Sequence, residues 1–145
     1  MRIPMKVDYA IRALLELSDT YGSGTKQSAD IAERWSIPAP YLDQLLTSLR
    51  KAGLVTSVRG PQGGHTLARA PGAITVSEVF EALEGPFSPI DCLEDSTRCN
   101  FARACAIQDL WGDVQTTVSR LLSSVTIADL TNKQAEKTRP AMYYI

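Results

Sequence analysis

The strongest constraint on the fold of this chain is a short helix, a tight turn, a second helix and a hairpin that follow one another directly. The first helix is predicted over 28–35, with Ser28 as its N-cap, and the break Ser36-Ile-Pro38 ends it. The second begins with Pro40 at its first position and ends at the C-cap Gly53. Strand-like segments at 54–58 and 65–69 then flank a glycine-rich turn. This order predicts a winged helix-turn-helix, whose second helix enters the major groove of DNA.

The remaining segments are also helical in pattern. Apolar spacing predicts a helix from Val7 to Tyr21, and a capping box of Thr75 with Glu78 starts another that ends at Gly85. A long amphipathic helix over 107–125 carries more apolar surface than a small core requires, which indicates a dimer seam. A short helix restarts at 126, and the tail from 131 is expected to be loose.

We therefore predict a mainly α-helical chain with a small β-hairpin wing, a winged helix-turn-helix plus a long dimerisation helix. The predicted parts are a DNA-binding domain at 1–85, a cysteine loop at 86–106, the dimerisation helix with a short following helix at 107–131, and a C-terminal tail at 132–145. Charged residues interrupt the apolar pattern of the first helix before a leader or membrane span could form. We expect a soluble, cytoplasmic protein without a membrane partner.

One region of the chain is basic although the formal net charge of the whole is only −1. Residues 34–69 hold five Lys or Arg against Asp43 alone, a local charge of +4, whereas residues 75–97 hold six acids and no Lys or Arg. The cations fall on the predicted second helix and hairpin, where a DNA-binding motif needs them. Alternatively, Arg50 and Lys51 only complement a helix C-terminus and the hairpin is an ordinary one.

The DNA interpretation assigns a role to each exposed polar side chain of this region. Pro40, Tyr41, Asp43 and Gln44 are expected to face base edges, with Ser28 and Thr47 on phosphates. Arg59 at the base of the glycine-rich tip is expected to enter the minor groove. The full candidate set is Ser28, Pro40, Tyr41, Asp43, Gln44, Thr47, Arg50, Arg59, Gln62 and His65.

Three cysteines, Cys92, Cys99 and Cys105, occur within 14 residues of irregular sequence. An odd number makes a poor disulfide framework, and thiolates at such spacing select iron–sulfur clusters, zinc or copper(I). A fourth ligand is then needed. The only histidine, His65, belongs to the predicted hairpin, Gln108 lies three residues past Cys105 but an amide is a weak ligand, and Asp8 near the start of the first helix supplies a carboxylate. The alternatives are that the cysteines are small core residues and that Asp8 stabilises a helix N-terminus.

Several of these segments together resemble the Rrf2 family of bacterial transcription regulators, which includes the iron–sulfur regulators of the IscR and NsrR groups. The resemblance covers nearly the whole chain. It rests on Met1-Arg-Ile, Tyr41-Leu-Asp-Gln-Leu-Leu46, Arg50-Lys-Ala-Gly-Leu-Val55, Val58-Arg-Gly-Pro-Gln-Gly-Gly64, the three cysteines, Leu110-Trp111 and Thr126-Ile-Ala-Asp-Leu130.

The resemblance implies a homodimer crossed at the long helix, with an iron–sulfur cluster in the cysteine loop that sets affinity for operator DNA. Arg59 and Asp43 match positions that the family uses for reading DNA. In the IscR group a histidine completes a 2Fe-2S site where this chain has Gln108. In the NsrR group a 4Fe-4S cluster takes an aspartate from the partner's first helix, and Asp8 matches that position. The implied metal ligands are Cys92, Cys99, Cys105 and Asp8.

We therefore predict a dimeric repressor of transcription whose cluster, 2Fe-2S or 4Fe-4S, senses redox state, nitric oxide or iron–sulfur status. Two alternatives keep the DNA-binding function: a zinc site, or a metal-free regulator that senses thiol oxidation or a metabolite through a partner protein. A small iron–sulfur electron carrier explains the cysteines but not the basic winged helix. An enzyme is not expected, because the chain has no phosphate loop, no nucleophile elbow and a single histidine.

Overall fold

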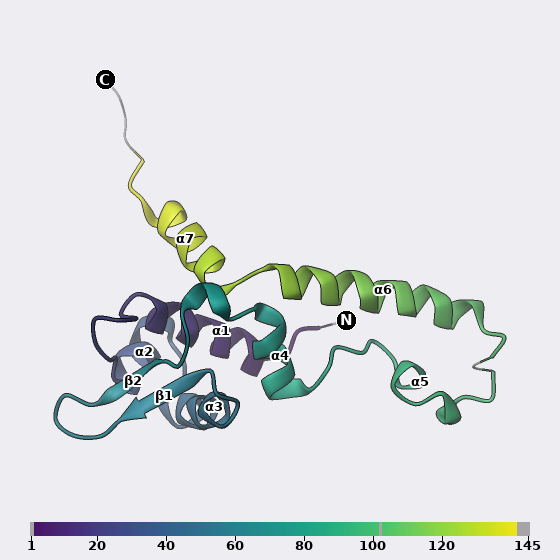
Figure 1. Ribbon diagram of the computed structural model, residues 1–145, viewed down its shortest axis with the longest axis horizontal. Helices are drawn as coiled ribbons and strands as arrows, with labels where there is room; N and C mark the ends of the chain where they lie inside the picture. Colours follow the sequence, from purple (N-terminus) through teal and green to yellow (C-terminus); the bar gives the residue numbers. More distant parts are fainter. Residues whose placement is uncertain (1, 102, 142–145) are drawn as a thin grey trace.

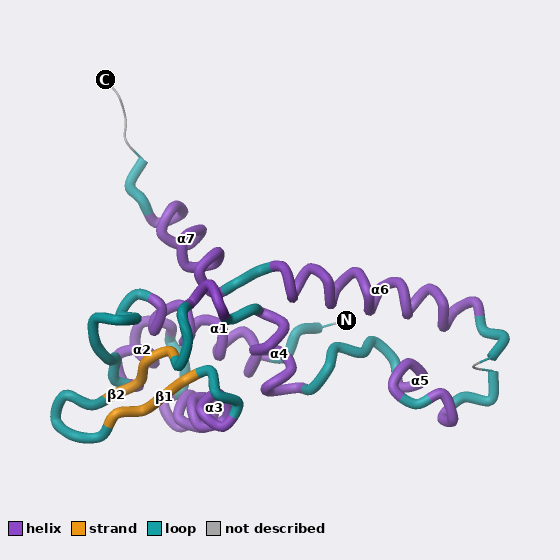
Figure 2. Tube along the Cα trace, viewed as in Figure 1, coloured by secondary structure: helices purple, strands orange, loops and turns teal. Residues whose placement is uncertain are grey.

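A computed structural model describes residues 2–101 and 103–141 of the chain (Figure 1). It is mainly helical with one two-stranded hairpin in the described part, as predicted (Figure 2). In chain order the elements are α1 (Met5–Ser18), α2 (Ser28–Trp35), α3 (Ala39–Lys51), β1 (Val55–Val58), β2 (Gly64–Leu67), a 3-10 turn (Pro71–Ala73), α4 (Val76–Glu84), α5 (Asp91–Glu94), a second 3-10 turn (Ser96–Arg98), α6 (Ala106–Ser124) and α7 (Ile127–Thr138).

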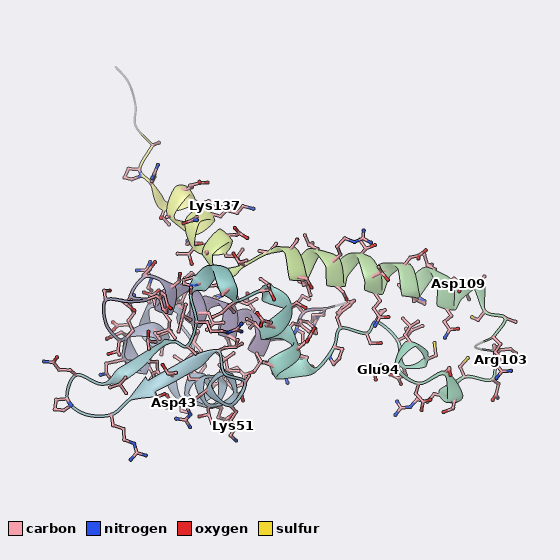
Figure 3. All side chains as sticks on the ribbon, viewed as in Figure 1. Asp43, Lys51, Glu94, Arg103, Asp109 and Lys137 are labelled. Atoms are coloured by element: carbon pink, nitrogen blue, oxygen red, sulfur yellow. The ribbon has the colours of Figure 1, made fainter. Side chains whose placement is uncertain are left out.

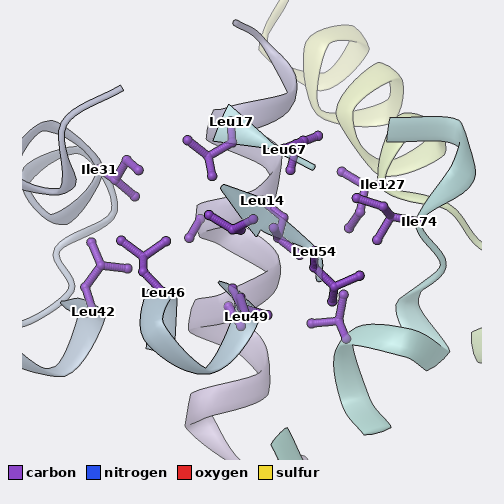
Figure 4. Close-up of a cluster of buried hydrophobic side chains, with 14 of the residues drawn as sticks. Leu14, Leu17, Ile31, Leu42, Leu46, Leu49, Leu54, Leu67, Ile74 and Ile127 are labelled. Carbon is purple, nitrogen blue, oxygen red and sulfur yellow. The ribbon is translucent and has the colours of Figure 1, made fainter. Parts of the chain in front are cut away.

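Helix α1 lies at the centre of the molecular body, and α2, α3, α4, the hairpin and α7 surround it (Figure 1). Its apolar spacing places Ala10, Leu14 and Leu17 on one face, each fully buried. Their partners come from every surrounding element and include Ile31, Leu42, Leu46, Leu49, Leu54, Leu67, Ile74, Val79 and Ile127 (Figure 4). Burying one such side chain contributes about 1.5–3 kcal/mol, so this face of α1 supplies much of the stability of the body.

Helix α6 and the cysteine-containing segment before it form an arm that leaves the body (Figure 1). The described residues of α6 include none that is fully buried. The chain returns to the body through paired backbone at the start of α4 and of α7, where the amide of Val76 donates to the carbonyl of Val125 at 2.9 Å and that of Ile127 to Ile74 at 2.9 Å. The body is thus closed by a segment that lies beyond the arm in sequence.

The predicted capping box of α4 is confirmed. The Glu78 amide donates to Thr75 Oγ1 at 3.2 Å, and the Thr75 amide donates to a Glu78 carboxylate oxygen at 2.9 Å. An equivalent box of Thr126 with Asp129 starts α7. Two reciprocal hydrogen bonds fix the start of each helix.

Several boundaries differ from the predictions, those of the strands and of α6 by one or two residues. Helix α1 ends at Ser18 rather than Tyr21, and Ser28 is the first residue of α2, with Gln27 as N-cap, so Ser28 makes no side-chain cap. Pro40 is the second residue of α3 rather than the first. The second position tolerates proline as well as the first does, because the N–H group of neither position has a hydrogen-bond partner within the helix. The tail expected from 131 is wrong: α7 continues to Thr138, since its capping box and buried Ile127 anchor it. The last residues of the predicted tail, 142–145, lie outside the described part.

The hairpin is anchored to the connection between α1 and α2. Lys26 and His65 exchange two backbone hydrogen bonds, of 2.9 and 2.8 Å, and Thr25 Oγ1 donates to the carbonyl of Gln62 at 3.2 Å. Gly64 has φ +153°, and a Cβ there would lie 2.6 Å from the Lys26 carbonyl oxygen. Glycine is therefore required at this position for the hairpin to sit against the connection.

Glu16 is the one buried charged residue in the described part of the chain, at 5% exposure. Its carboxylate accepts hydrogen bonds from Lys26 Nζ at 2.5 Å and Trp35 Nε1 at 2.9 Å, and Arg34 Nε lies at 2.9 Å. Burial raises the pKa of Glu16, but these hydrogen bonds and the charges of Lys26 and Arg34 lower it more, so the pKa lies below its usual value. Glu16 thus ties α1 to the end of α2 and to the hairpin anchor.

Replacing Glu16 by glutamine should destabilise the protein by about 1–3 kcal/mol at pH 7, because the half-buried Lys26 ammonium loses the carboxylate that balances its charge. A carboxylate with a lowered pKa contributes stability above its unfolded-state pKa, which is lost as the pH falls through the folded-state value. The loss of unfolding free energy caused by Glu16→Gln should therefore become smaller below about pH 4.5. Urea unfolding at pH 7 and pH 4 measures this, with the exposed Glu33→Gln as control. An unchanged deficit at the two pH values would contradict the assignment.

Candidate DNA-binding surface and cysteine loop

Helix α3 presents most of its predicted reading residues to solvent. Pro40, Asp43, Gln44 and Arg50 are exposed, and Thr47 is half-buried with its hydroxyl donating to the Asp43 carbonyl at 2.9 Å. Tyr41 differs from its neighbours, because its ring packs edge to face against Tyr9 of α1, with 5.8 Å between centroids. Tyr41 therefore joins the first turn of α3 to α1, whatever else it contacts.

The hairpin lies beside α3 as a wing. Arg59 and Gln62 are exposed at its tip, and Ser28 lies half-buried at the start of α2. His65 is half-buried at the base, where its Nδ1 and Ser57 Oγ are 3.0 Å apart. Burial lowers the pKa of His65; Asp43 raises it and Arg50 lowers it, and the result is below the usual value. The imidazole is part of the wing and is close enough to α3 for the charges of Asp43 and Arg50 to act on it.

Not all five cations of the basic region are free. Arg34 pairs with Glu16 at 2.9 Å, and Arg69 pairs with Glu78 at 2.8 Å. Within the residues that the structure describes, Arg50, Lys51 and Arg59 have no ion-pair partner, and all three are exposed. The cations available to a phosphate backbone therefore gather at the end of α3 and on the wing.

The three cysteines occupy different parts of the arm. Cys92 is in α5, Cys99 follows the second 3-10 turn, and Cys105 is the N-cap of α6. All three are free thiols and half-buried. Among the described residues no group of three or more Cys, His, Asp or Glu side chains is close enough to hold a metal ion. The donor chemistry suits a soft metal or a cluster, and the loop must close further to bring the sulfurs onto one centre.

Gln108 connects two of the cysteine positions. Its side-chain amide donates to the carbonyl of Cys92 at 3.1 Å, and its backbone amide donates to the carbonyl of Cys105 at 3.1 Å. Two turns further along α6, the Gln115 side chain donates to the carbonyl of Phe87 at 2.9 Å. These contacts hold the backbone at Phe87 and Cys92 against α6.

A cavity of about 430 Å³ lies where the arm joins the body. Phe80 of α4 and Trp111 of α6 line it, together with Phe87, which packs edge to face on Phe80 at 5.8 Å. The arm is therefore connected to α4 through aromatic side chains. The labelled residues Glu94 and Arg103 of the arm lie far from Asp43 and Lys51 of α3 (Figure 3).

Asp8 lies in the first turn of α1 and pairs with Arg12 at 2.8 Å. The Arg12 guanidinium lies over the rings of Tyr9 and Trp35, at 5.8 and 5.7 Å from their centroids. Because Tyr9 packs on Tyr41, Asp8 is joined to the first turn of α3 through Arg12 and Tyr9. Within one chain Asp8 is not grouped with the cysteines.

The sequence-based interpretation missed Glu16 and Lys26, which hold the wing in place, and the structural contacts of Gln108. An acid within the apolar stripe of α1 was the available signal for Glu16. The side-chain partners of Glu16 and Gln108 lie between 10 and 19 positions away in sequence, and Lys26 pairs with His65, which is 39 positions away.

Comparison with known proteins identifies the chain's relatives. Residues 3–133 match the model of Rrf2, described as an iron-dependent transcriptional regulator. The chain is 35% identical to the HTH-type transcriptional regulator CymR of Bacillus subtilis over the full length of both, and 38% identical to the regulator IscR of Erwinia tasmaniensis over 92% of this chain and 81% of that protein.

Solved structures agree. The structure of IscR from T. potens matches with a TM-score of 0.80 at 35% identity and covers 99% of this chain and 95% of that one. CymR, the global cysteine regulator of B. subtilis, matches with a TM-score of 0.78 at 35% identity and covers 92% of this chain and 98% of that one.

These findings confirm the winged-helix fold, and they confirm that the chain is not an enzyme, because its relatives are transcriptional regulators. No described helix is long and apolar enough to cross a membrane. The chain belongs to the Rrf2 family of transcriptional regulators.

Proposed function

We propose that this regulator is a cytoplasmic homodimer that represses transcription from operator DNA and whose affinity is controlled by an iron–sulfur cluster in the loop of Cys92, Cys99 and Cys105. The observation that carries the proposal is the presence of three free, half-buried thiols on one arm that is connected to the DNA-binding body. Three thiolates are the ligands that clusters prefer. A bound cluster supplies a centre that reacts with oxidants and nitric oxide.

Asp8 is the proposed fourth ligand, contributed by a second copy of the chain. Its carboxylate is 44% exposed and lies in the first turn of α1. The same carboxylate holds Arg12, which contacts Tyr9 and through it Tyr41. A change in what Asp8 binds therefore alters the support of the first turn of α3, which contains the proposed base-reading residues Pro40 and Tyr41. A difference of about 1.4 kcal/mol between two positions of α3 changes operator affinity roughly tenfold.

A second candidate function, a regulator without a cluster, also has observations in its favour. The described residues do not bring three metal-ligating side chains together, and the chain resembles CymR as closely as it resembles IscR. Of the solved relatives, one is the oxidised form of Staphylococcus aureus CymR, at 29% identity and a TM-score of 0.73. A metal-free regulator that responds to thiol oxidation fits these facts, and a zinc protein is the remaining alternative.

Metal analysis of protein purified without oxygen tests the cluster. We expect near-stoichiometric iron and acid-labile sulfide with a visible charge-transfer spectrum, and neither in a Cys92→Ser/Cys99→Ser/Cys105→Ser variant. Asp8→Ala should lose iron and sulfide faster in air than the wild type, whereas Asp19→Ala at the other end of α1 should not. Zinc alone, or no metal in protected protein, would refute the cluster and leave the second candidate.

The dimer proposal rests on the uncovered face of α6, where Ile107, Leu110 and Leu121 are 65, 56 and 62% exposed. Such spacing forms one apolar stripe along the helix, which a second copy would bury. Leu110→Glu with Leu121→Glu should give a monomer by sedimentation velocity. Thr116→Glu, on another side of the same helix, should remain dimeric. If the double variant remains a dimer, the dimer interface does not lie on this face of α6.

Operator binding tests the role of the wing. Arg59→Ala should weaken binding by about 1–2 kcal/mol and reduce the slope of log affinity against log salt by about 1, because one exposed cation is lost. Arg69→Ala is the matched control, since Arg69 already pairs with Glu78 and should not contribute. Fluorescence anisotropy on duplexes selected by the wild-type protein from a random library measures both. Equal losses for the two variants would remove Arg59 from the interface.

A further inference from the structure

One side of α6 faces the segment that leads into the cysteine loop. Gln108 and Gln115 each donate from that side to a backbone carbonyl of the segment, and a Cβ added at Gly112 would meet the Leu93 side chain at 4.0 Å. The three helix positions are spaced four and three residues apart, so they form one stripe. The two glutamine bonds differ in one respect: only that of Gln108 reaches a cysteine.

We propose that Gln108 is a positioning residue that holds Cys92 beside Cys105 and so prepares two of the three thiols to bind one centre. The inference rests on the proposed cluster function, which it deepens. The Gln108 side-chain amide donates to the Cys92 carbonyl at 3.1 Å. Cys105 is the N-cap of the same helix, and its carbonyl accepts from the Gln108 backbone amide at 3.1 Å, as in any first helical turn. The first and the third cysteine are thereby attached to the same turn of α6.

The physical benefit is a smaller loss of conformational freedom when the site forms. Twelve residues separate Cys92 from Cys105, and bringing the ends of such a loop together costs entropy. A hydrogen bond that closes the loop beforehand removes part of this cost. Cys99 lies between them in sequence, directly after the second 3-10 turn. It lines a separate cavity of about 300 Å³ with Thr97 and Arg103.

The same contact argues against Gln108 as a ligand. Amides are weak ligands for iron and zinc, and the amide nitrogen of Gln108 is already committed to the Cys92 carbonyl. The residue therefore acts on the site through the backbone of Cys92. Removing its donor should slow assembly of the site without removing a ligand.

Cluster-free protein gives the first test, and it does not depend on any metal. In a Cys99→Ser background only Cys92 and Cys105 remain, and dibromobimane becomes fluorescent when it bridges two neighbouring thiols. Gln108→Leu, which is neutral and cannot donate, should bridge about fivefold more slowly, as expected for loss of one hydrogen bond. Gln115→Leu should bridge at the parent rate. Equal rates in the two variants would overturn the proposal.

Cluster assembly gives the second test, in protein that retains all three cysteines. After anaerobic reconstitution with iron and sulfide, Gln108→Leu should form its visible spectrum more slowly and lose it faster in air, with Gln115→Leu matching the wild type. Gln108→Glu keeps the shape of the side chain and should behave like Gln108→Leu. If the wild type takes up no iron or sulfide, the cluster function fails while the bridging result still decides the role of Gln108. If all variants assemble clusters alike, Gln108 does not position the thiols.

Discussion

Burial of one face of α1 is the interaction on which the rest of the structure depends. Leu14 and Leu17 have no exposed surface, and the helices and strands that cover them come from almost the whole length of the chain. Because these elements share one central helix, α3 and the wing are fixed relative to each other. Glu16, on the same helix, adds the polar connection to Lys26, which in turn pairs with His65 of the wing.

The arm is built on a different physical basis. Helix α6 has no fully buried residue in the described part, and its contacts with the body run through Phe80, Phe87 and Trp111 around one cavity. Glutamine side chains rather than a core hold the cysteine segment to it. Fewer buried apolar contacts permit local rearrangement at low free-energy cost. The cysteine-containing segment on such an arm can change its conformation while the winged-helix body stays folded.

Local sequence patterns predicted most elements of the body, but they did not predict the contacts of the candidate site. Apolar spacing and the capping box of Thr75 predicted α1 to α4 to within a few residues, because core-facing helices must repeat every three to four positions. The extension of α7 was missed, since the tail is polar and its anchor, Ile127, binds a core formed elsewhere. The basic region was overestimated because Arg34 and Arg69 pair with acids outside it. Pairings across long sequence distances, including that of Gln108 with Cys92, follow from the fold rather than from spacing.

The central claim is that the state of the cysteine loop is transmitted to α3 and the wing. Its most direct test is the affinity of one protein preparation for a selected operator duplex, measured at fixed salt before and after the cluster is removed. We predict at least a tenfold difference, absent in the variant that lacks all three cysteines. Equal affinities, with iron and sulfide verified in the first sample and gone from the second, would contradict the account.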